Sequence, residues 1–173
     1  MTRELALVII AAFAVLLVAA GVWAWRRRAR RDSGIAAPTG EIPADADVIA
    51  VFSGFYVATT AHEQPLERLA IRGLGFRSRV DVTVTDAGVA LDLTGQPRLF
   101  LTREALVSVG RATVAIDRVV ERDGLVRVSW RTSDDTVADT YLRPQDASAG
   151  ALTDAVSGIL SAPTSTTPTG PDA

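Results

Sequence analysis

The 173-residue sequence contains no cysteine and no lysine, and it has a single histidine, His62. The absence of cysteine excludes disulfides, thiolate metal sites and a cysteine nucleophile. One histidine excludes a metal site built from several histidines. All 18 basic side chains are arginine, a bias that indicates a genome of high G+C content rather than a particular chemistry.

No group of residues in the sequence points to catalysis. His62 stands in AHEQP, a context that predicts a turn residue without a chemical role. The acid pairs Asp134–Asp135 and Asp45 with Asp47 fall in predicted loops, where solvated carboxylates are far commoner than general acid–base pairs. We therefore expect no enzymatic activity, no catalytic residue, no cofactor and no metal.

Long apolar runs are confined to Leu5–Trp25, where 21 residues carry no charge. A helix of this length spans roughly 31 Å at 1.5 Å per residue, the thickness of a bilayer hydrocarbon core. A soluble helix of this length would show a polar face, and this run shows none. The run predicts one transmembrane helix at residues 5–25, with Trp23 and Trp25 at the membrane interface.

Five arginines follow the apolar run at once: Arg26, Arg27, Arg28, Arg30 and Arg31. A cleaved signal peptide carries its positive charge before the apolar run instead. Because arginines stay on the cytoplasmic side, we expect residues 1–4 outside and the rest of the chain inside, at the cell membrane. Setting this topology is the simplest role of the basic juxtamembrane cluster at 26–31, and attraction to anionic lipid is the alternative.

The rest of the chain divides by composition into three parts. Residues 32–47 (DSGIAAPTGEIPADAD) have too few large apolar side chains to bury anything and are predicted to be a flexible linker. Residues 48–160 form one predicted domain. Residues 161–173 are predicted to be a disordered tail, to which Thr164, Thr166, Thr167 and Thr169 belong.

Period-2 patterns within the domain predict strands at 52–60, 66–73, 77–85, 89–93, 99–101, 107–120, 125–130 and 136–143. One helical turn is expected at 102–106, and a bulge at Gly54. Residues 77–93 are expected to form a hairpin, with a three-residue loop ending in a left-handed Gly88. In 125–131, Val126, Val128 and Trp130 should face the core, while Arg127, Ser129 and Arg131 should face water.

Residues 145–160 change to a helical period, with Leu152, Val156, Ile159 and Leu160 on one face. Asp146 or Ser148 is expected to cap this helix. About seven antiparallel strands followed by a single amphipathic helix is the element order of a pleckstrin-homology-like barrel. The predicted fold class is therefore mainly β with one carboxy-terminal helix, preceded by the transmembrane helix.

The chain also resembles a family of small actinobacterial membrane proteins with one amino-terminal helix and a pleckstrin-homology-like cytoplasmic domain. The stretches that carry the resemblance are FYVATT (55–60), PLERLAIRGLGFRSR (65–79), AIDRVVERDGLVRVSW (115–130) and DTYLRP (139–144). The resemblance implies no enzymatic activity, cofactor or catalytic residue. Because such proteins are often labelled as membrane or export proteins, it also implies an accessory subunit of a membrane or export complex as one role.

One basic, glycine-bearing turn is the candidate contact site for an anion or a partner, through Arg72, Gly73, Gly75, Arg77 and Arg79. Glycines let backbone N–H groups face outward, and arginines donate bidentate hydrogen bonds to phosphate or carboxylate. The alternative is a bent strand connection whose arginines are solvated or paired with nearby acids.

Residues 32–173 hold 12 arginines against 19 acids, a net charge of −7 that argues against nucleic acid and against an anionic membrane surface. We therefore predict a membrane-tethered interaction module that binds a protein partner or a second copy of itself. The alternative is a reader of anionic lipid headgroups through the arginine-bearing turn.

Overall fold

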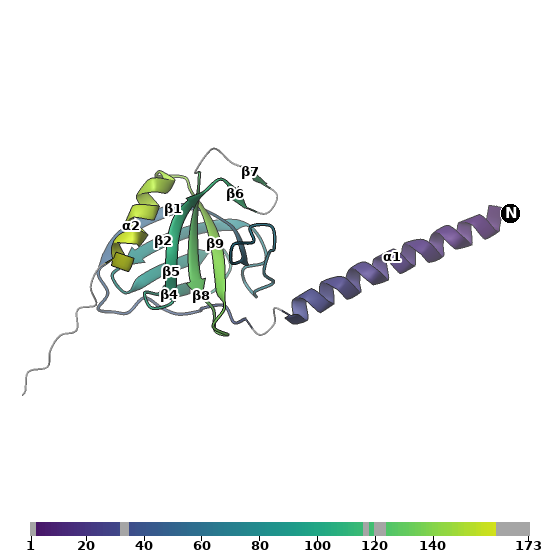
Figure 1. The fold of residues 1–173 in the computed structure, drawn as a ribbon, viewed down its shortest axis with the longest axis horizontal. Coiled ribbons are helices and arrows are strands. Elements are labelled where there is room, and N and C mark those ends of the chain that lie inside the picture. The colour runs from purple at the N-terminus through teal and green to yellow at the C-terminus, as the bar shows by residue number, and fades with distance from the viewer. Residues whose placement is uncertain (1–2, 32–34, 116–117, 120–123, 162–173) are drawn as a thin grey trace, which may run out of the picture.

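The computed structural model describes residues 3–31, 35–115, 118–119 and 124–161 (Figure 1). The tail predicted to be disordered lies outside the described residues from residue 162 onward, as do its four threonines.

The chain begins with one long helix, α1 (Arg3–Arg31), which stands apart from the folded domain (Figure 1). Within the described residues, it alone is long and apolar enough to cross a membrane, over Arg3–Arg27. The sequence prediction of an apolar amino-terminal helix is confirmed, and its orientation stays a prediction. The helix continues through the arginines, which are good helix formers.

Seven strands form one antiparallel sheet in the order β4-β3-β2-β1-β9-β8-β5. Their bounds are β1 (Val48–Ala61), β2 (Ser78–Thr85), β3 (Gly88–Leu93), β4 (Leu99–Thr102), β5 (Leu106–Ala112), β8 (Leu125–Arg131) and β9 (Val137–Pro144). A short hairpin of β6 (Val114–Ala115) and β7 (Arg118–Val119) stands apart from this sheet, and α2 (Ala149–Ser161) ends the described chain. The predicted fold class is confirmed.

The core lies inside the curved sheet and is closed by α2, which packs chiefly against β5 and β8. Leu152, Val156 and Ile159 supply the buried face of this helix, as their spacing predicts. Ser148 caps it by accepting a hydrogen bond of 3.1 Å from the amide of Ala151. The side chain of Asp146 instead accepts a bond of 2.9 Å from the amide of Ser53 on β1.

The strand predicted at 66–73 is wrong, because residues 62–77 form an irregular loop between β1 and β2. Arg68 organises this loop by donating hydrogen bonds to the carbonyls of Gly75 (2.9 Å) and Val57 (2.8 Å). Gly73 takes a φ of +84°, which turns the backbone away from an extended path. Buried Leu69 and Ile71 produce the apolar alternation that imitates a strand.

Gly88, predicted in a hairpin loop, and Gly54, predicted at a bulge, both allow strands to approach closely, and Gly88 has a positive φ of +152°. A Cβ on Gly88 would lie 2.2 Å from the carbonyl oxygen of Leu101, and β3 begins at this residue after a loop of only Asp86 and Ala87. A Cβ on Gly54 would lie 2.3 Å from the carbonyl oxygen of Arg143, whereas the bulge between β1 and β9 falls between Tyr56 and Ala58. The three-residue loop and the bulge at Gly54 are therefore wrong.

The strand predicted at 107–120 is confirmed only in its first part, since β5 ends at Ala112 and β6 and β7 follow. Residues 116–117 and 120 of this prediction lie outside the described residues. The helical turn predicted at 102–106 is a hydrogen-bonded turn that joins β4 to β5. Ser129, predicted to face water, is fully buried because its hydroxyl meets Asp139 beneath the loop at 62–77.

Part of the predicted linker packs on the domain. Thr39 pairs with Leu99, the first residue of the edge strand β4, and the side chain of Ile35 packs against the core. The amide of Ala36 donates to the hydroxyl of Ser133 at 3.2 Å. The expectation that this segment buries nothing is wrong for residues 35–41, because backbone pairing with an exposed strand edge needs few apolar side chains.

Candidate binding face

The five residues of the arginine-bearing turn make different contacts. Arg72 and Gly73 lie beside Gln96, whose side-chain oxygen would be 3.1 Å from a Cβ on Gly73. They help to line a cavity whose walls also include Trp25, Ala70 and residues of the segment 35–39. The carbonyl of Gly75 is occupied by Arg68 and points toward the domain.

The other two arginines gather on Phe55, which lies on the outer face of β1. The guanidinium carbon of Arg77 is 4.9 Å from the centre of the Phe55 ring, and that of Arg79 is 5.6 Å away. In the sheet register, Phe55 lies directly opposite Arg79 on β2 and Arg143 on β9. Directly opposed residues share one face of a sheet, so Arg143 lies on the same face as the ring and the two arginines stacked on it.

We call Phe55, Arg77, Arg79 and Arg143 the Phe55 cluster. Within the described ranges, none of its arginines forms an ion pair, and Arg77 and Arg79 are exposed. Arg98 is different, since Asp92 holds it at 2.7 Å and Glu41 at 3.0 Å. These two carboxylates, Asp92 foremost, raise the pKa of Arg98. The cluster therefore keeps guanidinium groups that an external anion can bind.

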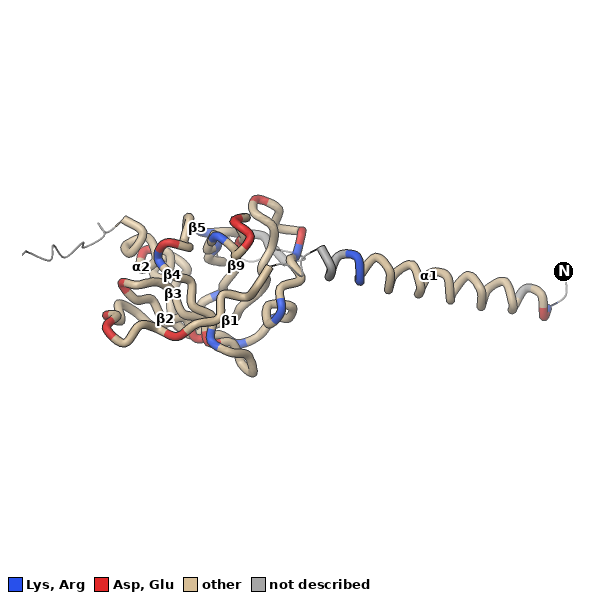
Figure 2. Tube along the Cα trace, turned by 90° about the horizontal axis from the view of Figure 1, so that it is seen from below, with Lys and Arg blue, Asp and Glu red and all other residues tan. Residues whose placement is uncertain are grey.

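An acidic region borders the cluster on the same sheet. Asp81 follows Arg79 on the outer face of β2 and lies opposite Asp92 on β3, and Ser53 donates to its carboxylate at 2.7 Å. These residues line a second, polar cavity with Arg79 and Gln145. Charges of both signs alternate along the trace, and the basic end of α1 is the end nearer the domain (Figure 2). The acids limit how far an anionic ligand can extend from the arginines.

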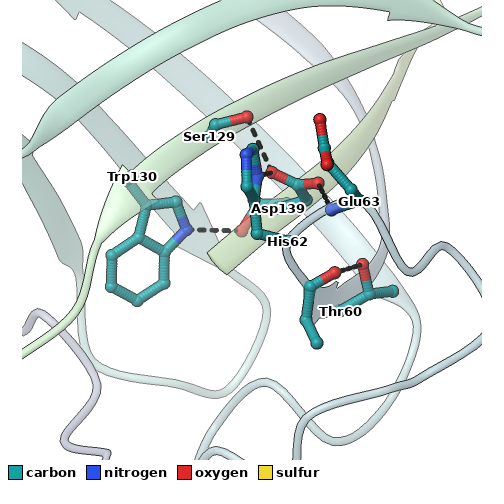
Figure 3. A network of polar contacts seen from close by, with 8 residues as sticks. Thr60, His62, Glu63, Ser129, Trp130 and Asp139 are labelled. Atoms are coloured by element: carbon teal, nitrogen blue, oxygen red, sulfur yellow. Dashed lines mark hydrogen bonds and ion pairs between the residues drawn. The ribbon is translucent and has the colours of Figure 1, made fainter. Parts of the chain in front are cut away.

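A buried carboxylate beneath the loop at 62–77 is the centre of a network of polar contacts (Figure 3). Asp139 on β9 is fully buried. Its Oδ1 accepts from the hydroxyl of Ser129 at 2.7 Å and lies 2.9 Å from Nδ1 of His62, and its Oδ2 accepts from the amide of Glu63 at 3.0 Å. The sequence reasoning missed this group, although an acid inside the β-rich TVADTYLR was a signal for it.

The arrangement around Asp139 is suited to holding the loop. The hydroxyl of Ser129 donates to the carboxylate and not to the imidazole, so the histidine does not activate it as a nucleophile. His62 is a turn residue, as its sequence context predicts, and its contact with β9 secures the start of the loop. A buried carboxylate with three partners is fully compensated, and removing it leaves donors unpaired.

A second buried chain of hydrogen bonds secures the end of the same loop. The Trp130 indole donates to Thr140 at 2.9 Å, and Thr140 lies 2.9 Å from the hydroxyl of Thr59. The Tyr56 hydroxyl lies 3.0 Å from Thr59 and donates to the carbonyl of Leu74 at 2.7 Å. Burial raises the pKa of Tyr56 to about 12. Hydrogen bonds therefore fix both ends of the loop to the sheet.

The remaining predicted residues stay at the surface. Asp134 accepts hydrogen bonds from the hydroxyls of Thr132 and Thr136, which lower its pKa, and Asp135 pairs with Arg131 at 3.1 Å. On α1, Trp23 and Trp25 are exposed, and the guanidinium of Arg27 lies 5.6 Å from the Trp23 ring. No three histidines, cysteines or acids of the described residues are grouped so that they could hold a metal ion.

Comparison with known proteins assigns the fold. A family model described as "Bacterial PH domain-like" matches residues 35–156. A solution structure of the carboxy-terminal phosphotyrosine interaction domain of mouse APBB2 is similar over 73% of this chain and 96% of that chain, with 18% identity and a TM-score of 0.47. The carboxy-terminal domain of an unknown protein from Leishmania infantum is similar over 68% and 87%, with 11% identity and a TM-score of 0.44. No curated protein matches the sequence.

Proposed function

The chain belongs to the bacterial PH domain-like family, and from this premise we propose that it is a membrane-tethered, non-enzymatic module whose Phe55 cluster binds an acidic segment of a protein partner. Such domains commonly mediate interaction or binding. The family match covers the sheet and most of α2, and it begins at Ile35, the residue where the described chain resumes after α1.

The observation that carries this proposal is the stacking of Arg77 and Arg79 on Phe55, with Arg143 opposite the same residue on β9. Stacking on an aromatic ring orders guanidinium groups before a ligand arrives. Ordered guanidiniums bind carboxylates through two parallel hydrogen bonds, and such charge-assisted bonds are the stronger class. The adjacent Asp81 repels an anion that extends toward β3, which favours a short acidic segment over a broad anionic surface.

The anchor supplies the location in this proposal. Residues 5–25 cross the cell membrane with residues 1–4 outside, and the domain lies at the cytoplasmic face. The arginines at 26–31 support this orientation. A second copy of the chain, or a membrane or export complex that the protein joins as an accessory subunit, would be a partner of the required chemistry if it presents acids to the cluster.

A second candidate function is recognition of anionic lipid headgroups through Arg72, Gly73, Gly75, Arg77 and Arg79. The exposure of Arg72 and Arg77 favours it. The net charge of −7 on residues 32–173 opposes it, since an anionic leaflet repels the domain as a whole.

Photocrosslinking at the cluster tests the proposal. Phe55 is replaced by benzoylphenylalanine in the full chain, which keeps an aromatic ring at the centre of the cluster, and the cells are irradiated. We expect a discrete protein adduct that falls by about a hundredfold or more when Arg79→Gln and Arg143→Gln are added, because each lost charged hydrogen bond costs about 1.5–3 kcal/mol. Mass spectrometry then identifies the partner.

Two controls accompany this experiment. Arg103→Gln with Arg111→Gln removes the same charge away from the cluster and should leave the adduct unchanged. Benzoylphenylalanine at Thr83, farther along the outer face of β2, should give no adduct. An adduct with a second copy would identify self-association, one with lipid alone would favour the second candidate, and no adduct at position 55 would reject the proposal.

A further inference from the structure

The docked segment 35–41 leaves a very short connection between the anchor and the domain. Only residues 32–34 separate Arg31, the last residue of α1, from Ile35, which packs against the core. Four peptide steps of at most 3.6 Å allow about 14 Å between the Cα atoms of Arg31 and Ile35. The whole segment 32–47, if it were a flexible chain, would reach roughly 20–24 Å on average and farther when extended.

This short connection determines which end of the domain lies nearest the bilayer. The membrane-spanning part of α1 ends at Arg27, and the four further helical residues rise about 6 Å. Ile35 therefore stays within about 20 Å of the end of the span. A domain of this size has a radius of gyration of about 14 Å and so a diameter of about 36 Å. The surface around Ile35 therefore lies toward the membrane-facing side of the domain and cannot lie at its far pole.

The loop at 62–77 occupies this end of the domain. Ile35 and Ala36 line one cavity together with Ala70, Arg72 and Gly73 of the loop. A neighbouring cavity also includes Ala70 and extends along the loop to Gly75 and Phe76. The loop residues that follow Ala70 therefore lie beside the point where the anchor joins the domain.

The exposed side chains of this loop suit the boundary between headgroups and acyl chains. Phe76 is 87% exposed and Leu66 is 71% exposed, although the loop around them is held at both ends and through Arg68. A bilayer beside the loop would cover these side chains and remove their apolar surface from water. Arg72, also exposed, can reach the headgroup region while its stem lies along apolar surface.

We propose that the loop at 66–77 rests on the bilayer in which α1 is anchored, with Phe76 entering the boundary between headgroups and acyl chains. The occupant of this surface is the membrane itself and not a soluble ligand. Tethering gives the loop a high effective concentration at the bilayer, so a contact too weak to recruit the isolated acidic domain is populated in the full chain. This contact also orients the domain relative to the bilayer, because it fixes which end of the domain faces the lipid. The inference rests on the proposed membrane anchor.

The absence of cysteine allows a direct test with single-cysteine variants of the full chain. Phe76→Cys, Asp86→Cys and Ala11→Cys are each labelled with bimane in vesicles of phosphatidylcholine and phosphatidylglycerol. Half of the vesicles carry lipid with a nitroxide near the headgroup end of the acyl chain. Asp86 follows β2 at the end opposite the loop, about 26 Å from Ser78 at 3.3 Å per residue, and serves as the matched control.

We expect the nitroxide to quench bimane at position 76 several-fold more than at position 86. Equal quenching at 76 and 86, with position 11 strongly quenched, would overturn the membrane contact and leave the anchor intact. An unquenched position 11 would overturn the anchor and the contact together. A 30-residue Gly-Ser insertion between Ser33 and Gly34 should reduce quenching at 76 toward the value at 86; unchanged quenching would show that the loop binds lipid without help from the tether.

Discussion

The carbonyl oxygen of Pro38 accepts a hydrogen bond of 2.7 Å from the amide of Phe100 on the edge strand β4. Two residues on, the amide of Gly40 donates to the carbonyl of Arg98 at 3.3 Å, and the side chain of Arg98 reaches Glu41. The segment that precedes the domain thus covers the outer edge of the sheet. Covering an edge strand protects it from pairing with other chains.

The first prediction concerns this segment. A soluble chain beginning at Glu41 should be less stable to urea than one beginning at Ile35, by about 2–4 kcal/mol, because it loses three hydrogen bonds and the packing of Ile35. Trp130 is the single tryptophan in both chains and reports unfolding by fluorescence.

A chain beginning at Ile35 that carries Glu41→Gln is the control, because it loses only an exposed ion pair with Arg98 and should change by less than about 1 kcal/mol. Identical urea midpoints for the two chain lengths would show that residues 35–40 contribute nothing to the fold.

The second prediction concerns Asp139. Asp139→Asn places an amide where a carboxylate accepts from Ser129 and from the amide of Glu63, so one or more buried donors lose a partner. We expect a loss of about 1–3 kcal/mol in the free energy of unfolding. Protease cleavage within the loop at 62–77 should also become faster, since His62 and Glu63 are released from β9.

Asp135→Asn is the matched control, because Asp135 forms only an exposed ion pair and its loss should change stability by less than about 1 kcal/mol. Equal stability of the Asp139→Asn variant and the parent would contradict the assigned role of Asp139.

The third prediction concerns alkaline pH. Burial raises the pKa of Tyr56 from 10.0 to about 12, so the unfolded chain loses the phenol proton before the folded chain does. The unfolded state then binds fewer protons, and stability falls as pH rises from about 10 to 12. Two pH units correspond to a loss of about 3 kcal/mol. Urea unfolding at pH 8, 10 and 11 measures this slope.

Tyr56→Phe should be less stable at pH 8, because the carbonyl of Leu74 loses its donor, but its stability should depend less on pH above 10. Burial also raises the pKa of Tyr141, so a smaller slope should remain. If Tyr56→Phe leaves the slope of stability against pH unchanged, another group causes the loss of stability at alkaline pH.

The fourth prediction concerns topology. A reporter that is active only outside the cytoplasm, fused after Ala173, should stay silent in cells. The arginines at 26–31 should keep the part of the chain that follows the helix in the cytoplasm. The same reporter fused before Met1 should be active. Replacing the five arginines with glutamine should give mixed orientation, and strong activity of the carboxy-terminal fusion to the unaltered chain would contradict the proposed placement.

The elements with a strong internal period were determined by the sequence itself. The uncharged run at 5–25, the alternation along Val80, Val82 and Val84, and the helical spacing of Leu152, Val156 and Ile159 each appear in the structure as predicted. Their order along the chain was sufficient for the fold class. In each case the pattern lies within one element, so no knowledge of distant residues was needed.

The candidate binding face was decided by the tertiary structure. Arg143 lies 88 positions after Phe55 in the sequence, and only the pairing of β9 with β1 brings it opposite that ring. Arg72 and Arg77, close in sequence, have different neighbours, since Arg72 lines a cavity with the segment 35–39 and Arg77 stacks on Phe55. Strand register and loop geometry depend on partners far along the chain, and periodicity within a segment carries no information about them.

The docking of segment 35–41 on the domain could not be predicted from the sequence either. Its composition is that of a linker, and its contacts with β4 use backbone groups that every residue carries. Such backbone hydrogen bonds cannot be predicted from the composition or the periodicity of the sequence. Only the open edge of β4, which exists once the sheet has formed, decides that this segment is held against the domain.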